Sequence, residues 1–121
     1  MTKEDRDLLL KDLCARLPYD VKCKIEMWIG CDVCTIYNIN SIGYVEIVED
    51  SDTNGISIEK VKPYLFPISS MTWEQECQYR EVIASSLNHY EVYDWLNKNH
   101  FDYRCLIEKG LAIDATGKNI Y

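Results

Sequence analysis

The fold class follows from residues 3–27, KEDRDLLLKDLCARLPYDVKCKIEM, in which a helical repeat gives way to a strand repeat. The first part predicts a helix over 3–16, because its leucines recur every three or four positions and Thr2 stands where it can cap the first turn. Pro18 ends that helix. Apolar and charged residues then alternate over 21–27, the pattern of a half-buried antiparallel strand.

Three more segments, rich in β-branched and aromatic residues, predict strands over 32–37, 44–49 and 56–61. We expect the four strands to follow one another as an antiparallel meander, with 51–55 connecting the last two. This small sheet either curls into a partly open barrel or lies flat under the helices. The prolines of 63–67, PYLFP, predict a rigid connection from the sheet to the second half of the chain.

Two or three helices are expected after the sheet. Thr72 and Gln75 have the spacing of a capping box, which predicts a helix over 73–87. Apolar spacing predicts a further helix over about 91–99. Residues 104–109 add at most one more helical turn.

At 121 residues the chain fits one α+β domain, 1–121, with an N-terminal helix, a four-stranded antiparallel meander and two or three C-terminal helices. We expect the second half to supply the larger share of the core, because large apolar residues recur there at helical spacing. These residues are Trp73, Tyr79, Val82, Ile83, Leu87, Val92, Trp95, Leu96, Phe101, Leu106, Ile107, Leu111 and Ile113.

The net charge of −7 limits the classes of partner. A general nucleic-acid binder, or a protein that docks on anionic lipid, would need a basic face, so neither nucleic acid nor membrane is expected as a partner. The apolar runs are too short to span a membrane. The N-terminus is charged and amphipathic, unlike a signal peptide, and we therefore expect a cytoplasmic protein.

Negative charge is concentrated in the sheet region, since no Lys or Arg occurs between Lys24 and Lys60. Aromatic residues share this region, and aromatic side chains amid acidic ones can bind a basic protein partner or a cationic ligand. The alternative is that the acidic residues keep the chain in solution and the rings belong to the core. The predicted partner-binding residues are Trp28, Tyr37, Tyr44, Glu46, Glu49, Asp50 and Asp52.

The loop 50–55 reads Asp-Ser-Asp-Thr-Asn-Gly, the first half of a calcium-binding loop. The closing bidentate Glu is missing, because Val61 occupies its position, and the flanking segments are predicted strands rather than helices. We interpret the segment as an acidic hairpin loop and predict no metal, with Asp50, Asp52 and Asn54 as weak candidates for a cation site.

The six cysteines are expected to be free thiols, because no export signal precedes them and a chain of this length can fold without disulfides. Cys31 and Cys34 form a single C-x-x-C at the start of a predicted strand. A structural zinc site needs four ligands, and a redox C-x-x-C normally begins a helix. We therefore predict neither zinc nor another cofactor.

Residues 100–104, HFDYR, combine titratable groups with an arginine, and they form an alternative ligand site of His100, Asp102, Tyr103 and Arg104. The competing interpretation is structural: His100 stands near a helix C-terminus, and Asp102 pairs with Arg104. Neither a nucleophile elbow nor a Gly-rich phosphate loop accompanies these residues, so no catalytic residue is predicted.

Three segments carry a resemblance to other proteins: LLLKDLCARLPYDVK (8–22), VKPYLFPISSMT (61–72) and DWLNKNHFDYRCLIEKGLAID (94–114). In these segments the chain resembles a large set of short, uncharacterised proteins of gut anaerobic bacteria and their mobile elements. The resemblance implies a mobile-element origin and a cytoplasmic location, and it brings no activity. In that set Gly is frequent at the positions of Asp20 and Cys105, where it would permit tight backbone geometry.

Three functions compete. The first is a small non-enzymatic interaction protein that binds a protein partner through an acidic, aromatic face of its sheet. The alternative is a protein that sequesters a small molecule or nucleotide, with cations supplied by Arg104, Lys109 and the first helix. An enzyme is the least favoured of the three, because no convergent catalytic set is visible.

Overall fold

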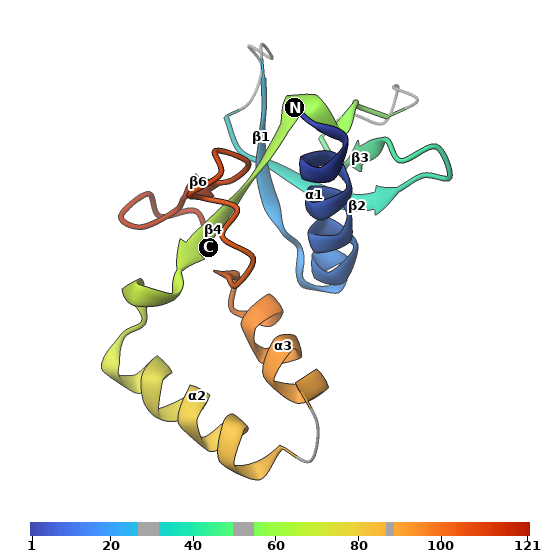
Figure 1. Ribbon diagram of the computed structural model, residues 1–121. Helices are drawn as coiled ribbons and strands as arrows, with labels where there is room; N and C mark the ends of the chain where they lie inside the picture. The colour runs from blue at the N-terminus through green and yellow to red at the C-terminus, as the bar shows by residue number, and fades with distance from the viewer. Residues whose placement is uncertain (27–31, 50–54, 87–88) are drawn as a thin grey trace.

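The structure is a computed structural model, and it describes residues 1–26, 32–49, 55–86 and 89–121. It confirms the α+β class and the order of helix, sheet and two helices (Figure 1). The helices are α1 (Lys3–Arg16), α2 (Trp73–Ser85) and α3 (His89–Lys98). The strands are β1 (Lys22–Ile25), β2 (Cys34–Ile39), β3 (Val45–Ile47), β4 (Val61–Pro67), β5 (Phe101–Asp102) and β6 (Ile113–Asp114).

The predicted boundaries of α1 are confirmed. The Thr2 hydroxyl accepts a hydrogen bond from the backbone N–H of Asp5 at 3.1 Å, which caps the first turn. After α1 the chain turns toward the sheet through a 3₁₀ turn, η1 (Leu17–Tyr19). Leu9 and Leu13 are fully buried in the same apolar cluster as the strands, so α1 covers one face of the sheet (Figure 1).

The sheet is open, with strand order β3-β2-β1-β4 and antiparallel pairing at each of these contacts. The alternation predicted for 21–27 is confirmed in β1. Cys23 and Ile25 are buried toward α1, whereas Lys24 between them is exposed on the other face. A half-buried antiparallel sheet therefore forms as the pattern predicts.

The fourth strand does not lie where the sequence predicts it. Residues 56–61 contain an isolated bridge and a 3₁₀ turn, η2 (Ile58–Lys60), and β4 begins only at Val61. β4 pairs with β1 rather than with β3, so the meander has three strands and β4 lies on its other side. The segment 63–67, predicted to be a rigid connection, is part of β4.

Prolines obscure β4 in the sequence, because a proline removes one hydrogen-bond donor from a ladder. Pro63 lies opposite Cys23 of β1, and on its other side the pairing with β6 starts only at Tyr64. The edge of β4 is then occupied by two parallel strands, β6 at Tyr64 and β5 at Phe66. Strands as short as β5 and β6 show no period of two, so the sequence did not predict them.

The core lies between α1 and the sheet, and α2 contributes no buried residue to it. Trp73 is 77 % exposed and Ile83 is 50 % exposed. The expectation that the second half supplies the larger share of the core is therefore wrong, because α2 adds nothing to the buried cluster and most members of the cluster lie before residue 62. The physical reason is that α2 packs chiefly against α3, and the two helices, which we call the helical hairpin, project from the sheet (Figure 1).

Local signals set the ends of the helical hairpin. The capping box is confirmed: the Thr72 hydroxyl accepts from the Gln75 backbone N–H at 3.2 Å, and the Gln75 side chain accepts from the Thr72 N–H at 2.9 Å. α2 ends at Ser85 and α3 begins at His89, each slightly before the predicted position. Residues 104–109 form turns rather than a helix.

A row of aromatic rings joins the helical hairpin to the C-terminal residue. Its members, in order of contact, are Tyr79, Trp95, Phe101, Phe66, Tyr121 and His100. Trp95 of α3 stacks between the rings of Tyr79 and Phe101, at centroid distances of 5.5 and 5.7 Å. Such pairs contribute about 0.5–1.5 kcal/mol each beyond the burial of their surface. The row therefore fixes α3 against the sheet.

None of the cysteines that the structure describes takes part in a disulfide bond: Cys14, Cys23, Cys34, Cys77 and Cys105. Cys23 and Cys34 are buried and lie opposite each other across β1 and β2. Cys31, the first cysteine of the C-x-x-C pair, lies outside the described residues.

At the two positions where Gly is frequent in the similar proteins, this chain has non-glycine residues with a left-handed backbone. Asp20 has φ of 53° and Cys105 has φ of 60°, both in the left-handed region. Asp tolerates this region better than most residues, whereas a cysteine Cβ is crowded there. Cys105 is exposed, so its side chain does not compensate by burial.

We expect Cys105→Gly to stabilise the protein by about 0.5–1 kcal/mol. Removing the Cβ relieves a steric cost of about 1–2 kcal/mol in the left-handed backbone conformation. The greater conformational entropy of Gly in the unfolded chain offsets about 0.5–1 kcal/mol of this gain. Urea unfolding followed by circular dichroism measures this difference. Cys105→Ala is the matched control, since it removes the thiol and keeps the Cβ. Equal stability of the two variants would show that the backbone is not strained at this position.

Candidate functional site

Part of the predicted acidic site lies outside the described residues. This applies to Trp28, Asp50 and Asp52 of the partner-binding set and to Asn54, the remaining cation candidate. Among the residues that the structure describes, no group of three or more His, Cys, Asp or Glu side chains is placed to hold a metal ion.

The described acidic residues of the sheet have local hydrogen-bond partners. The two carboxylate oxygens of Glu46 accept from the Tyr37 hydroxyl at 3.3 Å and from the Asn38 amide at 3.1 Å. Desolvation and the Glu46 carboxylate raise the pKa of the Tyr37 hydroxyl. Tyr37 is 53 % exposed, so the pair is accessible on the outer face of β2 and β3.

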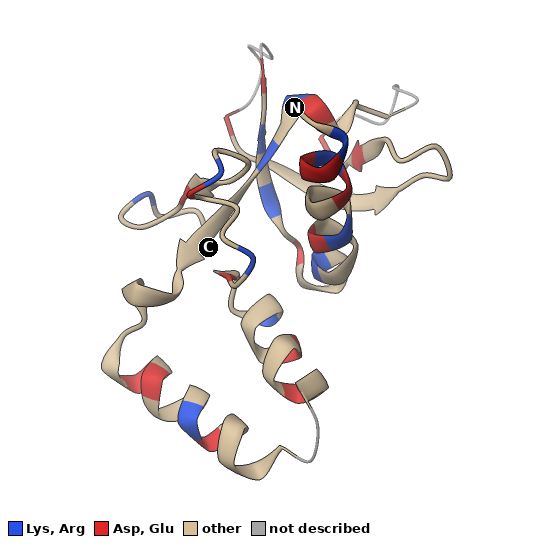
Figure 2. Ribbon diagram, in the orientation of Figure 1, with Lys and Arg blue, Asp and Glu red and all other residues tan. Residues whose placement is uncertain are grey.

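The outer face of the sheet carries both signs of charge. Glu49 accepts from the Thr35 backbone N–H through both oxygens, at 3.1 and 2.9 Å, and Tyr44 beside β3 is half-buried. Across β1 and β4, Lys24 lies opposite Lys62, and both are exposed (Figure 2). The predicted acidic and aromatic face therefore extends over β2 and β3 but not over β1 and β4.

Asp102, a member of the alternative ligand site, has a structural role. Its buried carboxylate accepts from three backbone N–H groups, those of Arg104 at 3.2 Å, Leu106 at 3.1 Å and Ile107 at 2.9 Å. A carboxylate with this many backbone donors organises the turn that follows β5. Asp102 therefore has few lone pairs left for a ligand.

Arg104 belongs to a buried network with α1. The fully buried carboxylate of Asp12 accepts from Arg16 Nε at 2.8 Å and from Arg104 Nε at 3.1 Å. Arg16 also donates from Nη2 to the carbonyl oxygen of Phe101 at 2.7 Å. One carboxylate thereby connects α1 to β5 and to the segment after it.

The Tyr103 ring contacts both guanidinium groups of this network. The guanidinium carbon of Arg16 is 5.3 Å from the centre of the Tyr103 ring and that of Arg104 is 4.8 Å from it. The Tyr103 hydroxyl donates to the Asn97 side-chain oxygen of α3 at 2.9 Å. These contacts fix the ring against both α1 and α3.

His100 is separated from Arg104 and packs on the C-terminal residue. Its ring stacks on Tyr121 at a centroid distance of 3.6 Å. Burial lowers the pKa of His100 to about 4, and the positive charges of Arg16 and Lys22 act in the same direction. The ring is therefore neutral at pH 7.

The structure thus divides the alternative ligand site instead of assembling it. Tyr103 and Arg104 lie together beside Asp12, whereas His100 stacks on Tyr121. Sequence reasoning missed Asp12 and its partner Arg16, although their spacing from Leu9 places them on the buried face of α1.

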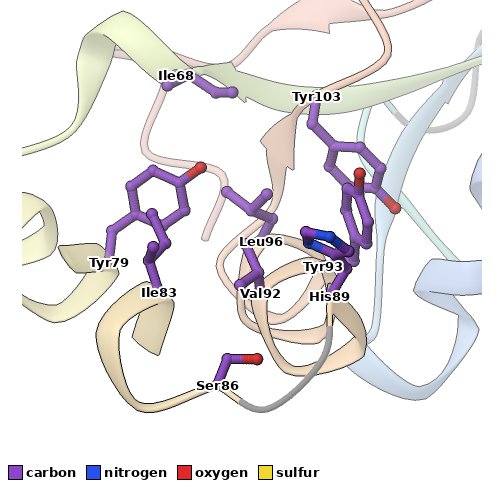
Figure 3. Close-up of a pocket in the computed structure, with 9 residues that line it drawn as sticks. All are labelled: Ile68, Tyr79, Ile83, Ser86, His89, Val92, Tyr93, Leu96 and Tyr103. Carbon is purple, nitrogen blue, oxygen red and sulfur yellow. The ribbon is translucent and has the colours of Figure 1, made fainter. Parts of the chain in front are cut away.

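A cavity of about 530 Å³ opens between the helices of the helical hairpin, and we call it the hairpin cavity. Figure 3 shows Tyr79 and Ile83 on one side and Val92, Leu96 and Tyr93 on the other. Its lining consists of Ile68, Tyr79, Ile83, Ser86, His89, Val92, Tyr93, Leu96 and Tyr103. The sequence did not indicate it, because apolar spacing in a helix is the same for a core face and for an uncovered face.

Comparisons of the chain with protein-family models, with curated proteins and with solved structures found no match. Within the described ranges, none of the helices has both the length and the apolar character that crossing a bilayer requires.

Asp12→Asn should lower the free energy of unfolding by about 3–5 kcal/mol, because it leaves two arginines without their carboxylate and Arg16 is fully buried. Urea titration at pH 7 measures the change. Asp7→Asn removes the same charge from an exposed position of α1 and should change stability by less than about 0.5 kcal/mol. Similar losses in the two variants would contradict the structural role of Asp12.

His100 should make stability fall as the pH is lowered. Because its pKa drops from an ordinary value near 6.5 to about 4 on folding, the unfolded chain takes up the proton first between these values. Stability from His100 is complete above about pH 6.5 and is lost as the pH falls toward 4. We expect a smaller loss in His100→Asn, since Asn accepts the φ of 62° at this position. An imidazole that titrates near 6.5 by NMR in the folded protein would contradict this prediction.

Proposed function

We propose that the chain is a small non-enzymatic domain that binds a basic segment of a protein partner on its helical hairpin. One observation carries the proposal: none of the 13 residues of α2 is buried. A helix is normally held in a domain by burying an apolar face. The uncovered α2 is therefore explained by a second surface that covers it in a complex.

The uncovered side chains are apolar and aromatic. Trp73 and Ile83 are the two most exposed large apolar residues of α2. Ile83 and Tyr79 form the α2 wall of the hairpin cavity, and Val92 and Leu96 lie on the α3 wall (Figure 3). A groove between two helices suits an apolar anchor from a helical segment.

Charge favours a basic partner over a second copy of the chain. Acidic side chains outnumber basic ones on both helices of the hairpin (Figure 2). The acidic residues are Glu74, Glu76, Glu81, Glu91 and Asp94, and the basic ones are Arg80 and Lys98. Because the whole chain has a net charge of −7, two copies repel each other, whereas a basic segment is attracted.

The lining of the hairpin cavity supports binding rather than catalysis. His89 is the one imidazole among the described residues that line it, and within the described part of the chain no hydrogen bond joins it to Ser86, to a carboxylate or to a thiol. General acid–base or nucleophilic catalysis needs such a second group within hydrogen-bond reach. An apolar and aromatic lining instead suits the recognition of a side chain.

The proposal places the partner on the helical hairpin instead of on the sheet face that the sequence indicated. Glu46 and Glu49, the described acidic residues of that face, already accept hydrogen bonds within the chain through both of their oxygens. A partner would have to compete with these bonds. The acidic residues of α2 lie instead on an exposed helix surface.

A synthetic amphipathic helix of Leu and Lys should bind the protein, and the Leu–Glu peptide of the same pattern should not. Ile83→Ser should weaken binding at least about tenfold, since it removes an apolar wall of the hairpin cavity. Ile42→Ser is the matched control, because Ile42 is also an exposed isoleucine and lies beside the sheet. Fluorescence anisotropy of labelled peptides measures both affinities.

The same two variants then test native partners by quantitative mass spectrometry of a pull-down. A protein that binds the hairpin should be retained when wild type or Ile42→Ser is the bait. The same protein should be lost when Ile83→Ser is the bait. Its binding should weaken as salt is raised. Equal binding of the Leu–Lys peptide by the two variants, or no binding of it at all, would refute the helical hairpin as the site.

A further inference from the structure

A second cavity lies on another side of α3, facing α1 and the segment after β5, and we call it the Arg104 cavity. Its volume is about 730 Å³, within the range of small-molecule sites. The residues that line it are Lys11, Ala15, Tyr90, Tyr93, Asp94, Asn97, Tyr103 and Arg104.

Two cationic side chains converge on the Arg104 cavity although the chain is acidic overall. Lys11 extends from α1 and makes no ion pair within the described residues. Arg104 uses Nε for Asp12 and Nη2 for the Tyr103 hydroxyl, at 3.1 and 3.2 Å. Its Nη1 has no hydrogen-bond partner in the described part of the chain, so it is available to an anion.

The side-chain amide of a largely buried residue also lines the Arg104 cavity. Asn97 is only 6 % exposed, and its side-chain oxygen accepts from the Tyr103 hydroxyl. Its amide nitrogen has no hydrogen-bond partner among the described residues. Because this nitrogen is not among the buried side-chain atoms that lack a partner, it reaches the open space of the cavity and can donate to a ligand.

The walls around this amide are aromatic. The rings of Tyr93 and Tyr103 lie 5.1 Å apart at an angle of 41°, and Tyr90, which is 83 % exposed, also lines the cavity. Aromatic side chains at the mouth of a polar cavity can stack on a flat ring. The cavity therefore offers a cationic end, an amide donor and ring surfaces.

We propose that the Arg104 cavity binds a small anion that carries a flat heterocyclic ring, the chemical class of the nucleoside monophosphates. The anionic group contacts Lys11 and Nη1 of Arg104. The ring lies against the tyrosines at the mouth, and a ring acceptor atom takes the hydrogen bond from the Asn97 amide nitrogen. All three features of the cavity then have a partner of matching chemistry.

Other ligand classes leave part of the cavity unsatisfied. A cation would meet Lys11 and Arg104, and the one carboxylate of the lining, Asp94, already accepts from the Tyr19 hydroxyl. A purely apolar ligand would leave the Asn97 amide without a partner. A simple anion such as phosphate would leave the tyrosine rings uncovered.

The first test compares three ligands by isothermal titration calorimetry of the full chain at low salt. AMP contains both the anion and the ring, ribose phosphate lacks the ring, and adenosine lacks the anion. We expect AMP to bind at least about tenfold more tightly than either of the other two. AMP binding no tighter than ribose phosphate, or no tighter than adenosine, would overturn the proposal, as would the absence of AMP binding at millimolar concentration.

Two lysines of α1 supply a matched pair of variants. Lys11→Gln should weaken AMP binding about five- to tenfold, because it removes one charged contact. Lys3→Gln removes the same charge from an exposed position that does not line the cavity, and AMP affinity should stay unchanged. Equal losses in the two variants would show attraction by general charge and would refute a defined site.

The proposal stands apart from the one on the helical hairpin, although Tyr93 and Tyr103 line both cavities. Ile83→Ser should leave the affinity for AMP unchanged, and Lys11→Gln should not weaken binding of the Leu–Lys peptide. The two sets of measurements can therefore succeed or fail independently.

Discussion

The buried carboxylate of Asp12 is the interaction on which the rest of the structure depends. It binds two guanidinium groups, one from its own helix and one from the segment that follows β5. Through Arg16, the same network also holds the carbonyl oxygen at the start of β5. Burying such charges is costly, so the geometry has to satisfy them with several hydrogen bonds at once. The packing of the C-terminal third against α1 is thereby restricted to one arrangement.

This restriction also determines where ligands can approach. Tyr103 contacts both arginines and is hydrogen-bonded to Asn97, and its ring, together with that of Tyr93, lines both the hairpin cavity and the Arg104 cavity. The aromatic row through Trp95 then fixes the position of α3. Both proposed sites therefore depend on a rigid centre, while the surfaces that contact partners lie on α2 and at the mouths of the cavities.

The sequence predicts those parts of the fold that depend on neighbours along the chain. The cap at Thr2, the alternation in β1 and the capping box at Thr72 are all read from adjacent residues, and the structure confirms them. The pairing of β4 with β1, where the sequence predicted pairing with β3, depends on segments that are distant along the chain. Prolines also mask the alternation of apolar and polar residues in β4. The position of α2 outside the core could not be predicted, because an apolar helical face has the same spacing whether a neighbour covers it or not.

The helical hairpin leaves and rejoins the sheet at a single place. Phe66 lies opposite Phe101 and Pro67 opposite Asp102 where β4 and β5 run side by side, so residues 68–100 begin and end as neighbours. The apolar cluster that holds the fold lies elsewhere, under α1. Changes within α2 therefore do not have to propagate into the apolar cluster, whereas Trp95 and Asn97 of α3 remain tied to Phe101 and Tyr103. Surface substitutions on α2 can therefore change what the hairpin presents to solvent while the apolar cluster under α1 keeps its packing.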